Sequence, residues 1–97
     1  MKMLKYLAEF IGTFIFLSVI LNIAGQTKMA ALAIGLALAT AVWWGGDISG
    51  GHFNPAVSTM FYLDDKLTRN DLIPYVIAQV LGGAAALHFS KMVAKGY

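Results

Sequence analysis

Apolar residues run along this chain in long stretches, and charged residues interrupt them only near their edges. The run from Tyr6 to Gly25 has 20 residues. As an α-helix it would be about 30 Å long, which is the thickness of a bilayer's hydrocarbon core. Two further runs, Met29 to Trp44 and Leu72 to Val93, have the same character. The pattern predicts three membrane-spanning helices over residues 6–25, 29–44 and 72–93.

The second and third runs carry small residues at helical spacing. Ala31, Gly35 and Ala39 recur every four residues, so they share one face of a helix. The third run has only glycine and alanine at 82–86. Because small side chains let two helix backbones approach closely within a membrane, we expect both helices to pack against neighbours on these faces.

The segment between the second and third spans combines irregular backbone with a short helix. Residues 45–53, GGDISGGHF, are too rich in glycine for a helix. Asn54 is a favourable N-cap and Pro55 a favourable first helical residue, so a helix is expected over Ala56 to Leu63, about 12 Å long. That length crosses half a bilayer. Residues 45–63 are therefore predicted to form a re-entrant loop and half-helix, and Asn70 or Asp71 to cap the third span.

Composition supports a membrane protein and excludes several classes of function. Of the 97 residues, 59% are hydrophobic and 12% charged, with a mean hydropathy of +0.70. We therefore expect an all-α, multi-pass integral membrane protein in the lipid bilayer, most simply the cell membrane. Glu9 interrupts the first apolar run, so we expect that run to be retained as a helix and not removed as a signal peptide.

Candidate chemistry for cofactors, nucleic acids or catalysis is missing from the sequence. The chain has no cysteine, and neither His52 nor His88 has a carboxylate at metal-ligand spacing. The net charge is only +2, without a basic patch. No nucleophile is paired with a base. We expect no metal, no cofactor, no nucleic-acid partner and no enzyme activity.

The stretch SGGHFNPAV, residues 49–57, carries chemistry suited to a pore. A half-helix beginning at Asn54 directs the positive end of its dipole and its unpaired N–H groups into the membrane centre. The Asn54 amide can donate hydrogen bonds to a passing water or hydroxyl, and an extended backbone before it would offer carbonyl acceptors. The predicted pore residues are Gly50, Gly51, His52, Phe53, Asn54, Pro55 and Ala56.

Four segments together resemble the N-terminal half of the aquaporin and aquaglyceroporin family over essentially the full chain. They are AEFIGTF at 8–14, AIGLALAT at 33–40, ISGGHFNPAVS at 48–58 and YVIAQVLGG at 75–83. The family fold has six tilted helices in two inverted repeats whose half-helices meet at the midplane. The resemblance therefore implies an aquaporin-like half-fold: one repeat over residues 1–97, with three spans and a single half-helix.

The resemblance also implies roles for particular residues. Asn54 would be the hydrogen-bond donor at the pore centre. Glu9 would brace the loop by accepting its backbone N–H groups, and Gln79 would do similar work from the third span. Ile34, with Gly51 and Val57, would occupy filter positions; Val57 stands where the family's second motif is followed by an arginine. The implied function is a passive channel for water, with glycerol and other small neutral solutes as further candidates.

Several alternatives remain open at this stage. Glu9 lies only one turn inside the first span and could reach the membrane interface. His52 is expected to brace the loop and not to relay protons. Because one repeat would expose polar groups to lipid, we expect antiparallel homo-oligomers, or pairing with a complementary C-terminal half. Other classes are a nonconducting truncated channel, and a dual-topology transporter that uses Glu9 as a proton-coupled carboxylate.

Overall fold

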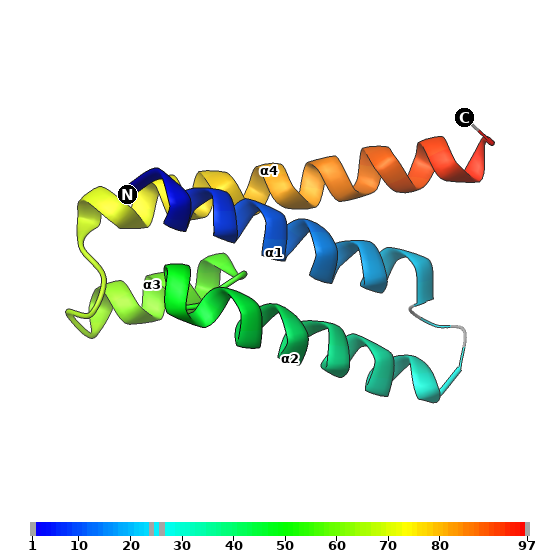
Figure 1. The fold of residues 1–97 in the computed structure, drawn as a ribbon, viewed down its shortest axis with the longest axis horizontal. Coiled ribbons are helices and arrows are strands. Elements are labelled where there is room, and N and C mark those ends of the chain that lie inside the picture. Colours follow the sequence, from blue (N-terminus) through cyan, green and yellow to red (C-terminus); the bar gives the residue numbers. More distant parts are fainter. Residues whose placement is uncertain (1, 24, 26, 97) are drawn as a thin grey trace.

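The computed structural model describes residues 2–23, 25 and 27–96 of the chain, and it contains four helices there (Figure 1). They are α1 (Lys2–Ile23), α2 (Met29–Ser49), α3 (Pro55–Leu63) and α4 (Arg69–Ala94). The three long helices form a bundle, and the short α3 occupies only the end that holds the N-terminus (Figure 1). Among the described residues, α1, α2 and α4 are long and apolar enough to cross a membrane. The prediction of an all-α membrane fold with three spans is confirmed.

Helix α1 is the centre of the bundle, because it packs against both α2 and α4, while α3 packs against α4. The closest approach lies where α4 carries its glycines. A Cβ atom built on Gly82 would lie 2.7 Å from the backbone oxygen of Phe10 on α1, so only glycine fits this crossing. Ala86 is fully buried on the same side of α4. The predicted close-packing face at 82–86 is therefore used within the chain.

The small-residue face of α2 behaves differently. Ala31, Gly35 and Ala39 are all exposed, and a Cβ on Gly35 would meet nothing within 4 Å. Large apolar side chains of α2, including Leu36 and Trp43, are exposed as well. This face of α2 has no neighbour in the described part of the chain.

Helix α2 is longer than its sequence pattern indicated. The predicted second span ended at Trp44 with an irregular loop from residue 45, but the helix continues to Ser49. The helix ends at Ser49 because the next residue, Gly50, adopts a left-handed conformation with φ +92°. The Gly50 N–H donates to the Gly46 carbonyl and caps the helix. Gly45 is a packing glycine, since a Cβ there would lie 2.7 Å from the Phe53 ring. The expectation of irregular backbone over 45–49 was wrong because glycine was read only as a helix breaker.

The other boundaries shift by smaller amounts. Helix α1 begins at Lys2 and ends at Ile23, whereas the predicted span 6–25 includes residue 24, which lies outside the described residues. Helix α3 begins at Pro55 behind an Asn54 cap, as expected. The cap of α4 is Thr68, whose hydroxyl accepts from the Asp71 backbone N–H, and not Asn70 or Asp71. Pro74 is accommodated inside α4 near its start.

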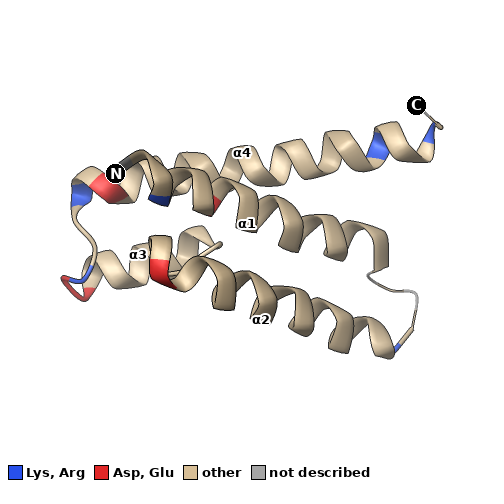
Figure 2. Ribbon diagram, in the orientation of Figure 1, with Lys and Arg blue, Asp and Glu red and all other residues tan. Residues whose placement is uncertain are grey.

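Charged residues gather toward the ends of the bundle (Figure 2). No charged residue occurs in 10–23, 29–46 or 72–90, which lie within the three long helices. At the α3 end the Lys5 ammonium lies 2.6 Å from the Asp71 carboxylate, and the Tyr6 hydroxyl donates to the same carboxylate at 2.6 Å.

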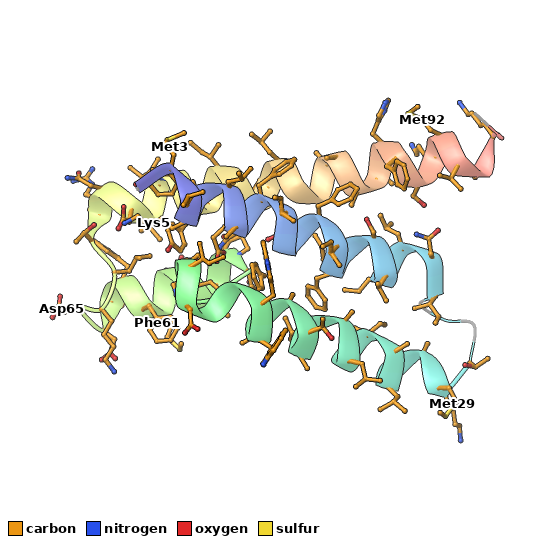
Figure 3. The ribbon with its side chains drawn as sticks, viewed as in Figure 1. Met3, Lys5, Met29, Phe61, Asp65 and Met92 are labelled. Carbon is orange, nitrogen blue, oxygen red and sulfur yellow. The ribbon has the colours of Figure 1, made fainter. Side chains whose placement is uncertain are left out.

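In Figure 3, Met3 and Met92 point away from the bundle, and Asp65 marks the end beyond α3. These apolar outer faces suit a protein surrounded by lipid.

Candidate pore loop and half-helix

Glu9 lies at the centre of the polar contacts between the loop and the long helices. It is fully buried, and both carboxylate oxygens are used. Oε1 accepts from the Phe53 backbone N–H at 2.8 Å and from Gln79 Nε2 at 2.7 Å. Oε2 accepts from the His52 backbone N–H at 3.1 Å and from the Ser49 hydroxyl at 2.7 Å. Glu9 therefore holds the loop from α1 and does not extend to the membrane interface.

The groups around the Glu9 carboxylate are all hydrogen-bond donors. Three of the four are N–H groups, which can only donate, and an ionised carboxylate offers about four acceptor positions. The Ser49 hydroxyl supplies the fourth hydrogen and accepts in turn from the Gly51 N–H at 3.2 Å. Four donors therefore match the acceptor positions of the buried Glu9 carboxylate.

Gln79 joins the loop brace to the half-helix. Its Nε2 group donates to Glu9 and, at 2.8 Å, to the buried Ser58 hydroxyl on α3. It does not accept from the loop backbone, which was the expectation, because Glu9 already occupies those N–H groups. Gln79 thus orients the carboxylate and fixes α3 to α4.

His52 braces the half-helix through its ring. Nδ1 lies 2.8 Å from the Ser58 hydroxyl, and the ring stacks on Phe61 of α3 with centroids 4.8 Å apart. The Ser58 oxygen accepts a hydrogen bond from the Gln79 amide. The hydroxyl hydrogen of Ser58 is then available to be donated to His52 Nδ1. We therefore assign the hydrogen of the neutral imidazole to Nε2. Phe61 can be located on α3 in Figure 3.

The loop backbone is not extended, contrary to expectation. Gly50, Gly51 and Phe53 all have positive φ, at 92°, 65° and 52°. For Phe53 this conformation is unusual, and two features hold it: the backbone N–H bound to Glu9, and a ring that is 2% exposed. A Cβ on Gly12 of α1 or on Gly45 of α2 would overlap or crowd this ring. The two glycines form a socket for Phe53, which locks the loop between the helices.

The tip of the half-helix is exposed beside a cavity. Asn54 caps α3 by accepting the Ala56 N–H at 2.9 Å, and Asn54, Pro55 and Ala56 are all exposed. Next to this tip is a cavity of about 390 Å³ between α1 and α4. Its lining includes Phe16 and the polar residues Thr13 and Gln79. The Asn54 amide is thus presented at a hollowed face and not covered by its own chain.

The residues expected at the filter do not form a cluster in one chain. Gly51 is buried against α2, where a Cβ would lie 3.3 Å from Cα of Val42. Ile34 is half-buried eight residues earlier on α2, about 12 Å along the helix axis. Val57 is half-buried on the first turn of α3. Their role as a filter stays a prediction.

Sequence reasoning missed Ser49, Ser58, Tyr75 and the Phe53 socket. Tyr75 caps α2 from α4, because its hydroxyl donates to the Ser49 carbonyl at 2.6 Å. A signal was present: Tyr75 and Gln79 lie four residues apart and, with Ala78, Gly82 and Ala86, define one face of α4. Gly12 lies one turn beyond Glu9 on α1 and could have been found in the same way.

Comparison with known protein families identifies the family of this chain. The model of the family described as Major intrinsic protein matches residues 1–97, the whole chain. The chain belongs to the major intrinsic protein family. The members of this family are integral membrane channel proteins and not enzymes. The resemblance drawn from the four sequence segments is confirmed.

Individual major intrinsic proteins are similar to the chain over part of their length. Glycerol uptake facilitator protein-like 6 of Lactiplantibacillus plantarum is 43% identical over 87% of this chain and 41% of its own length. Aquaporin Z of Brucella melitensis is 43% identical over 95% of this chain and 45% of its own length. Aquaporin Z of Photorhabdus laumondii is 34% identical over 95% and 44%. The chain therefore spans less than half the length of each of these relatives.

Proposed function

We propose that the chain forms a passive channel for water and small neutral solutes such as glycerol, in which two inverted copies of the repeat enclose the pore. The observation that carries this proposal is the exposed Asn54 amide, which caps the first turn of the half-helix α3 inside the bundle. Glu9, Gln79, His52 and Ser58 hold this half-helix rigidly. A fixed donor at the membrane midplane is what a chain of passing water molecules needs, since it replaces hydrogen bonds that lipid cannot supply.

Pairing follows from the length of α3. With 9 residues, α3 is about 13 Å long and spans less than half of a 30 Å hydrocarbon core. A continuous polar path needs a second half-helix from the opposite side, which an antiparallel copy supplies. The cationic residues allow insertion in both directions, because the two ends of the bundle carry four and three of them. These are Lys2, Lys5, Lys66 and Arg69 at the α3 end, and Lys28, Lys91 and Lys95 at the other.

The filter of such a pair would be apolar. Each half would contribute Ile34, Gly51 and Val57, and the position after the motif where the family's arginine is expected holds Val57 in both copies. Without a lumenal cation, the dipoles of the two half-helices form the main barrier to cations. We therefore expect poorer discrimination between water and glycerol, and weaker proton exclusion, than a pore with an arginine provides.

Flux from the purified chain tests this function. In reconstituted vesicles, stopped-flow light scattering should give water and glycerol permeabilities above those of protein-free vesicles. Asn54→Ser keeps a good N-cap but removes the amide donor, so water permeability should fall about twofold to tenfold, as for a hydrogen bond of 0.5–1.5 kcal/mol. A permeability equal to that of empty vesicles, from a preparation shown to be paired, would reject the channel.

Two other functions make different predictions. An accessory half that needs a separate C-terminal half would conduct only after that half is added. A proton-coupled transporter would need Glu9 to load and release a proton, but its carboxylate is fully buried with four donors around it. These four donors disfavour the transporter.

Single-cysteine labelling at Thr68 from each side of intact vesicles separates dual from single topology, and one-sided labelling contradicts the antiparallel pair.

A further inference from the structure

Among the described residues, the end of the bundle away from α3 carries basic side chains and no acidic ones. The chain has 5 acidic residues, and all of them lie toward the α3 end. They are Glu9, Asp47, Asp64, Asp65 and Asp71. Figure 2 shows both kinds of charge at the α3 end and only basic segments at the other. We call this other end, which holds Lys28, Lys91 and Lys95, the cationic end.

The lysines at the two ends differ in their partners. At the α3 end, the Lys5 ammonium lies 2.6 Å from the Asp71 carboxylate, and the Lys66 ammonium lies 3.1 Å from the Asp64 carboxylate. At the cationic end all three lysines are exposed, and none forms an ion pair within the described part of the chain. The positive charge of this end is therefore available to an anion from outside the chain.

Lys91 and Lys95, the C-cap of α4, share one side of that helix. A set of positions along α4 recurs in alternating steps of four and three residues, and residues at this spacing lie on one side. The set is Ile77, Leu81, Ala84, His88, Lys91 and Lys95, and every member is exposed. The opposite side holds the buried residues Tyr75, Ala78, Gly82 and Ala86. Met92, between the two lysines in sequence, points away from the bundle in Figure 3. We call the six exposed residues the outward face of α4.

Polarity along the outward face changes as it does through one leaflet of a bilayer. Lys91 lies 20 residues beyond Asp71, and no charged residue occurs between them. This separation corresponds to about 30 Å along the helix axis, which is the thickness of the hydrocarbon core. Lys91 therefore lies where the hydrocarbon ends. From His88 to Lys95 the helix rises about 10 Å, enough to cover a headgroup layer of about 5–8 Å.

We propose that the outward face of α4 binds a phospholipid with an anionic headgroup. The phosphate lies between the ammonium groups of Lys91 and Lys95, the His88 ring adds an N–H donor, and an acyl chain follows the apolar part of the face. Charge complementarity selects this occupant, because each lysine near a membrane surface strengthens the attraction to anionic lipid and the cationic end has no carboxylate that competes. The inference depends neither on conduction nor on pairing between copies.

Lipid association can be measured at the face itself, because the chain has no cysteine. Leu81→Cys places one fluorophore on the outward face, and Leu36→Cys places one on α2 as the matched control; the two leucines are 54% and 58% exposed. The full chain is reconstituted in phosphatidylcholine vesicles, and trace spin-labelled phosphatidylglycerol or phosphatidylcholine quenches the fluorophore. At low salt, phosphatidylglycerol should associate about threefold to tenfold more strongly than phosphatidylcholine at Leu81, and less than about twofold more strongly at Leu36.

Removal of the charges tests which residues select the lipid. Lys91→Gln combined with Lys95→Gln should lower the preference at Leu81 to less than about twofold, because the phosphate loses both cations. Salt at about 1 M, where the Debye length is about 3 Å, should lower the preference in the same way. Lys28→Gln is the matched control, since it removes an exposed lysine from the same end but from the start of α2. It should leave the preference at Leu81 unchanged.

Three results would overturn the proposal. The first is equal association of the two lipids at Leu81, or a preference that survives the loss of both Lys91 and Lys95. The second is an equal loss with Lys28→Gln, which would show a diffuse attraction to the whole cationic end and not a site on α4. The third is weak quenching by both lipids at Leu81 together with strong quenching at Leu36, because protein and not lipid would then cover the outward face. Water flux is measured separately, so a nonconducting chain that prefers phosphatidylglycerol at Leu81 supports the lipid site and rejects only the channel.

Discussion

The two ends of the bundle differ in how their buried polar groups are satisfied. The end that holds α3 contains a connected set of hydrogen bonds. Its members are Glu9, Ser49, His52, Ser58 and the Nε2 group of Gln79. Toward the other end, beyond the half-helix tip, the Thr13 and Ser18 hydroxyls are buried without a partner among the described residues. The half-helix and its loop supply hydrogen-bond partners at one end only, and even there the Gln79 amide oxygen has no partner among the described residues.

The difference separates the parts of the repeat that are held within the described chain from the parts that are not. The loop has its own brace, because α1, α2 and α4 each contribute a residue that holds it: Glu9, Ser49 and Gln79. The exposed small-residue face of α2 and the cavity beside Asn54 have no such complement in the described part of the chain. In a lipid environment apolar surface can remain uncovered, but unpaired polar atoms carry a cost that pairing removes.

The largest effect should come from Glu9→Gln at the braced end. The amide keeps one accepting oxygen, and its NH₂ group would face the two donors that the other carboxylate oxygen had bound, so about two charge-assisted hydrogen bonds are lost. At about 1.5–3 kcal/mol each, the free energy of unfolding should fall by about 3–6 kcal/mol. Denaturant titration in micelles, followed by the fluorescence of Trp43 and Trp44, measures it. Hydrogen exchange at His52 and Phe53 should rise, and unchanged exchange would show that Glu9 does not hold the loop.

A serine pair tests the comparison directly. Ser58→Ala removes the oxygen shared by His52 and Gln79 and should cost about 1–3 kcal/mol, because both groups lose a partner in a buried site. Ser18→Ala removes a hydroxyl that has no partner among the described residues and should change stability by less than about 0.5 kcal/mol. The same titration serves for both. Equal effects of the two substitutions would remove the distinction between the ends.

The smallest effect is expected at the surface of the braced end. Lys5→Met keeps the apolar stem and removes the charge paired with Asp71, where the two side chains are 25% and 19% exposed. Such a pair contributes about 0–1 kcal/mol, and the loss should shrink as salt is added. Lys66→Met is the control, since its pair with Asp64 is 67% and 61% exposed and should contribute less. A larger loss for Lys66→Met, or a loss independent of salt, would contradict this ranking.

The elements could be predicted where one physical rule dominated. Apolar runs of 16–22 residues identified the three spans, and the Asn54–Pro55 cap located the start of α3. Residues 45–49 could not be assigned in this way, because Gly45 serves the Phe53 ring and not the backbone conformation. The cap of α4 was also misplaced, since Thr68, Asn70 and Asp71 are all capping residues and local sequence does not rank them.

The sequence by itself determined that the chain lies in a membrane, that it carries one half-helix, and to which family it belongs, because hydropathy and motif order are local properties. Only the tertiary structure decided which polar atoms are satisfied. Glu9, Ser58 and Gln79 lie 21 to 70 residues apart in the chain, and hydrogen bonds at such separations depend on how the helices cross. The same crossings leave the Thr13 hydroxyl and the Gln79 amide oxygen without a hydrogen-bond partner among the described residues.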